Sequence, residues 1–172
     1  EEFRRILTDY GEEKWAARIA QIFAEKRAQK PIETTADLVA VVDAAIPKAV
    51  RRKDDGHPAR RTFQAVRIAV NDELAPLEKA LRDFVELLAP GGRLLVITFH
   101  SLEDRIVKNT FRAMQHPCTC PPKAPICPCG KVPLGKALGG GGVKPSNREV
   151  QENVRARSAK LRIFEKNREE GE

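Results

Sequence analysis

One segment, residues 88–99, constrains the fold more than any other part of the chain. It reads Leu-Ala-Pro-Gly-Gly-Arg-Leu-Leu-Val-Ile-Thr-Phe, in which Ala-Pro-Gly-Gly stops a helix and a continuous apolar run follows from Arg93 to Phe99. A run of this length is strand-sized, and strands without polar alternation are typical of parallel sheets that are covered on both faces. We therefore predict that a helix ends here and that residues 93–99 form an inner strand of an α/β sheet.

The residues before this junction predict helices. Apolar side chains recur there at three-to-four-residue spacing, which is the period of an amphipathic helix. One helix is predicted to open at Thr34 or Thr35 and to stop at Pro47, and a polar, basic loop follows. Pro58 is predicted at the first position of the next helix. Pro76 is predicted to divide the remaining stretch into two helices or to kink it.

The residues after the junction predict α/β structure. Ser101 is predicted to cap a helix, with Asp104 three residues later, because a hydroxyl at that position accepts a backbone N–H. Four glycines at residues 139–142 are predicted to form a flexible tether. Residues 158–164 alternate small or apolar residues with charged ones, which predicts a half-exposed or edge strand.

The composition fits one globular domain or a piece of a larger protein. The 172 residues carry 31 Lys and Arg against 24 Asp and Glu, a formal charge of +7, and the 41% hydrophobic residues exclude a wholly disordered chain. No apolar run approaches the roughly 20 residues of a membrane span, and the start lacks the order of a secretory signal. The chain has no initiator Met and opens in a predicted helix, so we expect it to begin within a longer protein.

All four cysteines lie within residues 118–129, in the pattern C-x-C-x₆-C-x-C. Such clustering predicts one local site in a reducing, cytoplasmic setting. Four thiolates complete a tetrahedral zinc site, which would be structural because no position stays open. C-x-C is less usual for zinc than C-x₂-C, and two local disulfides or four thiols without metal are the alternatives. The predicted ligands are Cys118, Cys120, Cys127 and Cys129.

Positive charge concentrates in residues 46–70, with seven Lys or Arg against two Asp. Such an excess favours contact with an RNA backbone, and Arg also stacks on unpaired bases. The alternative is a solvated helix with ordinary ion pairs. The same two interpretations apply to a second basic stretch, residues 144–162. The candidate RNA-binding residues are Lys48, Arg51, Arg52, Lys53, Arg60, Arg61, Arg67, Asn71, Arg155 and Arg157.

Residues 99–105, Phe-His-Ser-Leu-Glu-Asp-Arg, follow the predicted strand, at the edge where open α/β sheets place ligand sites. The candidate catalytic residues are Phe99, for packing or stacking, and His100, Ser101 and Asp104, for polar contacts. The alternative is that they only cap the helix and pack. No Gly-rich loop follows a strand, and no acid suited to a ribose ends the next one, so no cofactor-binding residue is predicted in this chain.

Four stretches together resemble the RsmH (MraW) family: residues 10–20, 57–74, 90–108 and 153–162. The cysteine run is also similar to one in many members. These S-adenosylmethionine-dependent enzymes methylate N4 of a cytidine in the small-subunit (16S) ribosomal RNA. The resemblance covers nearly the whole chain but only the C-terminal part of the family's protein.

The resemblance implies an α/β fold, the C-terminal part of a Rossmann-like class I methyltransferase with a helical insertion domain. Residues 1–72 would be most of the RNA-receiving insertion, and residues 73–172 would return to the catalytic domain, with a Cys-rich loop at 116–130. The S-adenosylmethionine site would lie mostly on residues outside this chain, which alone would be inactive.

Several further expectations follow from the resemblance. The implied partner is small-subunit ribosomal RNA or the assembling 30S subunit in the cytoplasm, with no membrane association, and a homodimer is an assembly to test. The alternative from another class is a non-catalytic, zinc-stiffened RNA-binding module.

Overall fold

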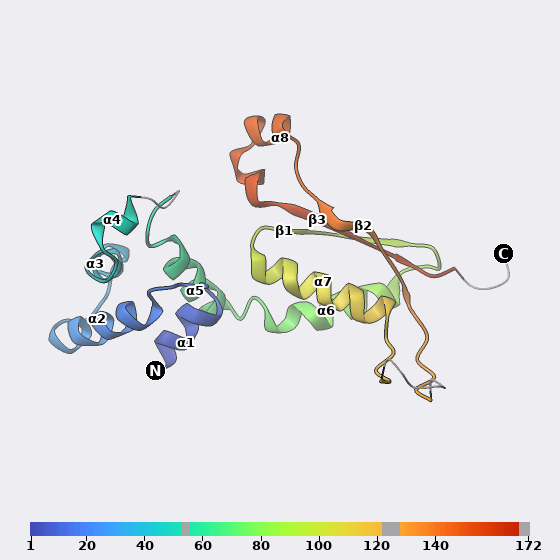
Figure 1. Cartoon of the computed structure of the whole chain (residues 1–172), viewed down its shortest axis with the longest axis horizontal. Helices are drawn as coiled ribbons and strands as arrows, with labels where there is room; N and C mark the ends of the chain where they lie inside the picture. Colours follow the sequence, from blue (N-terminus) through green and yellow to red (C-terminus); the bar gives the residue numbers. More distant parts are fainter. Residues whose placement is uncertain (53–55, 122–127, 169–172) are drawn as a thin grey trace. The chain divides into compact units, whose positions relative to one another are not determined.

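The computed structural model describes residues 1–52, 56–121 and 128–168. The chain divides into two compact units, a helical unit, Glu1–Glu73, and a sheet unit, Leu74–Glu172 (Figure 1). Every helix among the described residues is too short or too polar to cross a bilayer. Lys53, a predicted RNA-binding residue, and Cys127, a predicted zinc ligand, lie outside the described residues.

The helical unit packs its helices around one apolar core that includes Leu7, Ile19 and Val41. As predicted, the third helix follows Thr34, whose hydroxyl accepts from the backbone N–H of Asp37 at 3.1 Å while the Asp37 carboxylate accepts from the Thr34 N–H at 2.9 Å. This capping box fixes the helix start. The helices are α1 (Glu2–Asp9), α2 (Ala16–Gln29), α3 (Thr35–Ala45), α4 (Lys48–Arg51) and α5 (Arg60–Asn71).

Two predictions for this unit are wrong in detail. The stretch predicted as a basic loop contains the short helix α4. The next helix, α5, begins at Arg60 and not at Pro58. The reason lies in His57, whose carbonyl accepts from the Arg60 N–H at 3.0 Å and whose Nδ1 accepts from the Ala59 N–H at 3.2 Å. These two bonds form a turn ahead of the helix, and Pro58 lies in that turn.

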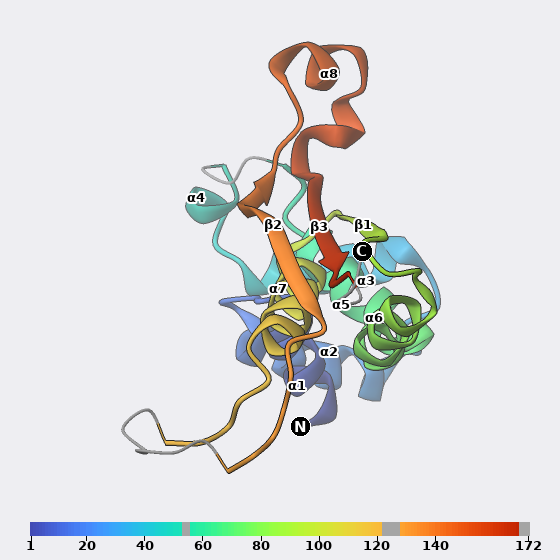
Figure 2. The same ribbon diagram turned by 90° about the vertical axis from the view of Figure 1, so that its right-hand side faces the viewer.

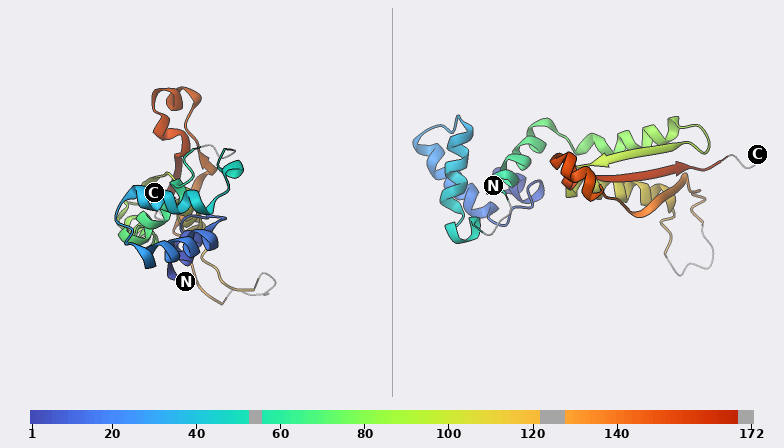
Figure 3. Two further views of the ribbon diagram at one scale, coloured as in Figure 1. Left: turned by 90° about the vertical axis from the view of Figure 1, so that its left-hand side faces the viewer. Right: turned by 90° about the horizontal axis from the view of Figure 1, so that it is seen from above.

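The sheet unit places two helices against one face of a three-stranded sheet (Figures 1 and 2). The strand order is β1-β3-β2, and β3 runs antiparallel to both neighbours (Figure 3). Phe111 and Phe164 meet in the core between helix and sheet, with ring centroids 5.2 Å apart. The elements are α6 (Ala75–Leu87), β1 (Arg93–Thr98), α7 (Ser101–Gln115), β2 (Gly135–Val143), α8 (Asn147–Glu152), a 3₁₀ helix (Val154–Ser158) and β3 (Lys160–Lys166).

The division near Pro76 is confirmed. Helix α5 ends at Asn71, Asp72 takes a left-handed conformation with φ of 49°, and α6 begins at Ala75 with Pro76 in its first turn. Proline fits there because the first helical N–H groups have no partner within the helix.

The prediction that residues 93–99 form a parallel strand buried on both faces is wrong for the described structure. β1 lies at one edge of the sheet and pairs antiparallel with β3. Leu94 and Val96 pack against the helices, whereas Leu95 and Ile97 on the other face are 57% and 60% exposed. The reason is that α6 and α7 lie on one face only, and no described residue covers the second face.

Two predictions for the end of the chain are wrong in part. Residues 158–164 predicted a half-exposed or edge strand; β3 is half-exposed, as predicted, but it is the central strand and not an edge. At its end, Lys166 Nζ donates to the carbonyls of Glu86 and Leu88 at 2.8 and 2.7 Å. Residues 139–142 predicted a tether, yet β2 continues through them with an irregular register. Three of these glycines have positive φ, which glycine adopts without a steric cost.

Candidate functional site

The turn after β1 is built around the side chains of His100 and Glu103. His100 caps α7, because its Nδ1 accepts from the Glu103 N–H at 3.3 Å. In return, Glu103 Oε2 accepts from the backbone N–H groups of Phe99 at 2.8 Å and His100 at 3.3 Å. The cap is therefore His100, and the prediction of Ser101 is wrong by one residue. The Glu103 carboxylate decides this, because it reaches back to two amides at once.

The second ring nitrogen of His100 is the unusual atom of this turn. Nε2 is buried and lies 3.2 Å from Glu103 Oε1, but it makes no aligned hydrogen bond with any residue that the structure describes. Because Nδ1 accepts a hydrogen bond, the neutral ring carries its proton on Nε2. A buried N–H that lies beside a carboxylate without an aligned hydrogen bond is unusual, because buried polar groups are nearly always paired.

Asp104 faces β3. Its Oδ1 accepts from Arg162 Nε at 2.6 Å, and its Oδ2 accepts from Arg162 Nη2 at 2.9 Å and Lys160 Nζ at 2.8 Å. The Arg162 guanidinium, together with the Lys160 ammonium, lowers the pKa of Asp104 to about 2. Asp104 is therefore ionised near neutral pH and joins α7 to the central strand.

The four candidate residues of this turn have different surroundings. Phe99 is 55% exposed, Ser101 is exposed, and His100 is nearly buried. Sequence reasoning missed the contacts of Glu103, although the spacing from His100 to Glu103 is that of a capping box. It also missed Arg162 as the partner of Asp104, and no local signal exists because 58 positions separate the two residues.

Three cysteines converge in the sheet unit. The Sγ atoms of Cys118, Cys120 and Cys129 all lie within 4.8 Å of one another. Thiolates that share a tetrahedral Zn²⁺ at about 2.3 Å lie about 3.8 Å apart. The arrangement therefore needs only a small contraction to hold such an ion.

Several of the candidate RNA-binding side chains have acidic partners. Arg51 pairs with Asp43. Arg67 donates two hydrogen bonds to Glu73, at 2.8 and 2.9 Å, and Asn71 donates a third to the same carboxylate at 3.0 Å. The others are exposed: Lys48 on α4, Arg52 after it, Arg60 and Arg61 on α5, and Arg155 and Arg157 on the 3₁₀ helix of the sheet unit.

Comparison with known proteins supplies a family. The model of a family described as the MraW methylase family matches residues 1–167. Proteins named ribosomal RNA small subunit methyltransferase H are 57% identical to this chain in Symbiobacterium thermophilum, 54% in Ruminiclostridium cellulolyticum and 56% in Heliobacterium modesticaldum. These alignments cover 96%, 94% and 96% of this chain, but 52%, 51% and 52% of the relatives. The chain thus spans about half the length of the curated relatives it matches.

Proposed function

Because this chain belongs to the MraW methylase family, we propose that it is the C-terminal part of a methyltransferase that acts on small-subunit ribosomal RNA with S-adenosylmethionine. The observation that carries the proposal is 57% identity over 166 residues to a protein of that name. The specific target that we propose is N4 of a cytidine. Nothing in the comparisons favours the alternative of a non-catalytic RNA-binding module.

We further propose that the sheet unit belongs to a Rossmann-like domain and that residues 1–72 form its helical insertion. β1 and β2 both run antiparallel to β3, so they run parallel to each other. The outer edge of β1 pairs with no described residue, and Leu95 and Ile97 present an exposed apolar face. An edge of this kind suits further strands, because unpaired strand edges and apolar faces are costly in water.

In the proposed reaction an N–C bond forms between N4 and the methyl carbon of S-adenosylmethionine, the sulfonium S–C bond breaks, and N4 loses a proton. This chain's part is positioning, which brings reacting groups together in a productive geometry. The exposed ring of Phe99 would pack on the base, and the Nε2–H of His100 and the hydroxyl of Ser101 would contact its polar edge. Asp104 is a positioning residue, because its contact with Arg162 holds α7 against β3.

The described residues do not fit a site for the cofactor itself, since none of them forms a Gly-rich loop between a strand and a helix of the kind that binds nucleotides. We propose that those contacts lie outside this chain. The test is calorimetric titration of S-adenosylmethionine into this chain and into a chimera in which the chain replaces the aligned 166 residues of the Symbiobacterium thermophilum relative. Binding by the chimera alone is expected. Micromolar binding by the isolated chain would contradict this assignment.

We also propose that the cysteines hold a structural zinc ion. The support is the convergence of three Sγ atoms within 4.8 Å, with Cys127 as the fourth ligand. Four thiolates would leave no open position on the ion, so the ion would stabilise residues 116–130 and take no part in the methyl transfer.

The proposed partner is the assembling 30S subunit or its RNA, and the bacterial cytoplasm is the location that this partner implies. A homodimer is a further proposal, which sedimentation analysis of the chain tests directly. A single species at the monomer mass would contradict it.

A further inference from the structure

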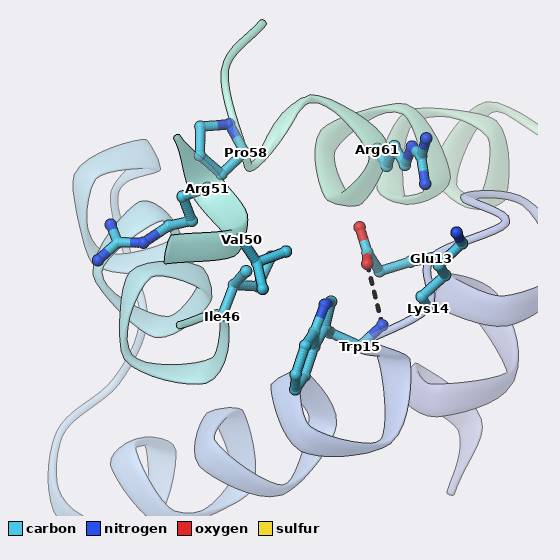
Figure 4. A pocket seen from close by; sticks show the side chains of 8 residues that line it. All are labelled: Glu13, Lys14, Trp15, Ile46, Val50, Arg51, Pro58 and Arg61. Carbon is cyan, nitrogen blue, oxygen red and sulfur yellow. Dashed lines mark hydrogen bonds between the residues drawn. The ribbon is translucent and has the colours of Figure 1, made fainter. Parts of the chain in front are cut away.

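The helical unit contains a pocket of about 200 Å³ that the proposed reaction does not use (Figure 4). It lies where the turn before α2, the segment from α3 to α4, and α5 meet. Gly11 lets the turn before α2 pass close to the backbone of α5, because a Cβ at this position would lie 2.7 Å from the Leu7 carbonyl oxygen and 3.0 Å from the Arg61 carbonyl oxygen. The lining residues are Glu13, Lys14, Trp15, Ile46, Val50, Arg51, Pro58 and Arg61.

One side of this pocket is aromatic and apolar. Figure 4 shows the Trp15 indole beside Ile46 and Val50, with Pro58 above them. Pockets for drug-sized ligands measure about 300–1,000 Å³, so this volume suits a single flat ring. Base–aromatic stacking is the common way in which proteins hold unpaired nucleotides.

The rest of the lining is charged. Lys14 and Arg61 are exposed, and neither pairs with a carboxylate among the residues that the structure describes. One guanidinium nitrogen of Arg51 pairs with Asp43, but the buried Nε of Arg51 has no hydrogen-bond partner in the described part of the chain. Lys14, Arg51 and Arg61 make part of the lining cationic, although Figure 4 shows the Arg51 guanidinium directed away from Trp15. Cations beside an aromatic ring favour a ligand that is both aromatic and anionic.

Glu13 decides how such a ligand would lie. Its side chain is buried, and its Oε1 accepts from the Trp15 backbone N–H at 3.0 Å. A buried carboxylate in the lining repels a phosphate but accepts hydrogen bonds from base N–H groups. The base therefore takes the interior, and the phosphates take the rim at Lys14 and Arg61.

We propose that this Trp15 pocket binds one unpaired nucleotide of the RNA substrate, with its base stacked on the indole. The inference rests on the proposed function, because it presumes that the substrate is RNA. It adds a contact distant in sequence from the turn after β1, and it joins Arg51 and Arg61, predicted separately from charge, to an aromatic residue.

Trp15 is the only tryptophan of the chain, so its fluorescence reports directly on the pocket. The experiment titrates the full chain with a labelled single-stranded RNA of about ten nucleotides, and follows label anisotropy and tryptophan emission together. We expect emission to fall with the same midpoint as the rise in anisotropy. RNA binding with unchanged emission would overturn the pocket proposal and leave RNA binding intact. No binding in either signal would overturn both the pocket and the proposed RNA contact.

Variants supply the second readout. Trp15→Ala should weaken RNA binding about 5- to 100-fold, and Trp15→Phe should retain most of the affinity because phenylalanine also stacks. Arg61→Ala should weaken binding, whereas Arg18→Ala, a matched change on the exposed face of α2, should not. Circular dichroism checks that each variant keeps its helices. Folded Trp15→Ala protein with unchanged affinity would contradict the proposal.

Discussion

Arg162, on the central strand, donates hydrogen bonds from Nε and Nη2 to the two carboxylate oxygens of Asp104 at 2.6 and 2.9 Å. The side chains of both residues are largely buried, 9% and 17% exposed. Lys160 adds a third contact to the same carboxylate at 2.8 Å. These contacts join α7 to β3 directly behind the turn that carries His100, so the placement of that turn depends on them.

Asp104→Asn should lower the free energy of unfolding of the sheet unit by about 2 kcal/mol at neutral pH, because the pKa of Asp104 is lowered from 3.8 to about 2. A lowered pKa means that this stabilisation is complete above pH 3.8 and is lost as the pH falls toward 2. Urea denaturation at a series of pH values measures the difference between wild type and variant. The difference in unfolding free energy between wild type and variant should shrink as the pH falls from 3.8 toward 2.

The matched control is Asp83→Asn, which breaks the exposed ion pair with Lys79 on α6. Exposed pairs contribute little to stability, so its unfolding curve should match that of the wild type. A loss of stability that is equal in the two variants, or independent of pH, would contradict the role of Asp104.

His100→Asn separates the two functions of His100. Asparagine is a good N-cap, so α7 should keep its start, but the variant lacks the Nε2–H. In the chimera, methyl transfer should fall about 10²-fold with stability retained, as for loss of one preorganised donor. His100→Ala should also destabilise the fold by about 1 kcal/mol. Unchanged transfer by a protein with alanine at both His100 and Asp104 would show that this turn is not part of the substrate pocket.

The cysteine site predicts one zinc ion per chain after purification in zinc-containing medium. Elemental analysis measures the stoichiometry, and Cys118→Ser or Cys129→Ser should abolish it because a structural site needs all its thiolates. Thr119→Ser is the matched control between two of the ligands. Metal-free protein from such a preparation would instead support free thiols or disulfides.

Ion pairing predicts different effects for two arginines of α5. Both side chains are exposed, but Arg67 is bound to Glu73 at 2.8 Å, whereas Arg60 has no carboxylate partner among the residues that the structure describes. Arg60→Ala should therefore weaken RNA binding and reduce the slope of log affinity against log salt by about 0.7. Arg67→Ala should change the slope less. Anisotropy titrations at several salt concentrations measure both slopes, and equal slopes would show that Glu73 does not neutralise Arg67.

Local sequence patterns predicted most helices and strands, but they did not predict contacts between residues that are distant in the sequence. Thr34 and Pro76 act within a few residues of their own positions, so they marked helix boundaries correctly. The apolar run predicted the strand β1 correctly but did not predict how far its two faces are buried, because burial depends on which elements lie against each face. The alternation in residues 158–164 predicted a half-exposed or edge strand but did not reveal that β3 is central, because that position depends on pairing with both β1 and β2 and on distant partners such as Asp104 for Arg162.

The same difference between local patterns and distant contacts applies to the candidate site. The segment that includes Phe99 and His100 is a candidate because it follows a strand. The sequence pointed to Ser101 as the cap and missed the contacts of Glu103. The Trp15 pocket escaped notice because Trp15 and Arg61 lie 46 positions apart and meet only through packing of the helices. Charge clustering predicted a basic surface, but not an aromatic residue beside it.

The most direct test of the central claim is methyl transfer by the chimera with the Symbiobacterium thermophilum relative. The chimera is incubated with unmethylated 30S subunits and labelled S-adenosylmethionine, and the ribosomal RNA is digested and its nucleosides are identified by mass spectrometry. We expect label in N4-methylcytidine with the chimera and none with this chain alone. A folded chimera that binds S-adenosylmethionine but leaves the RNA unlabelled would contradict it.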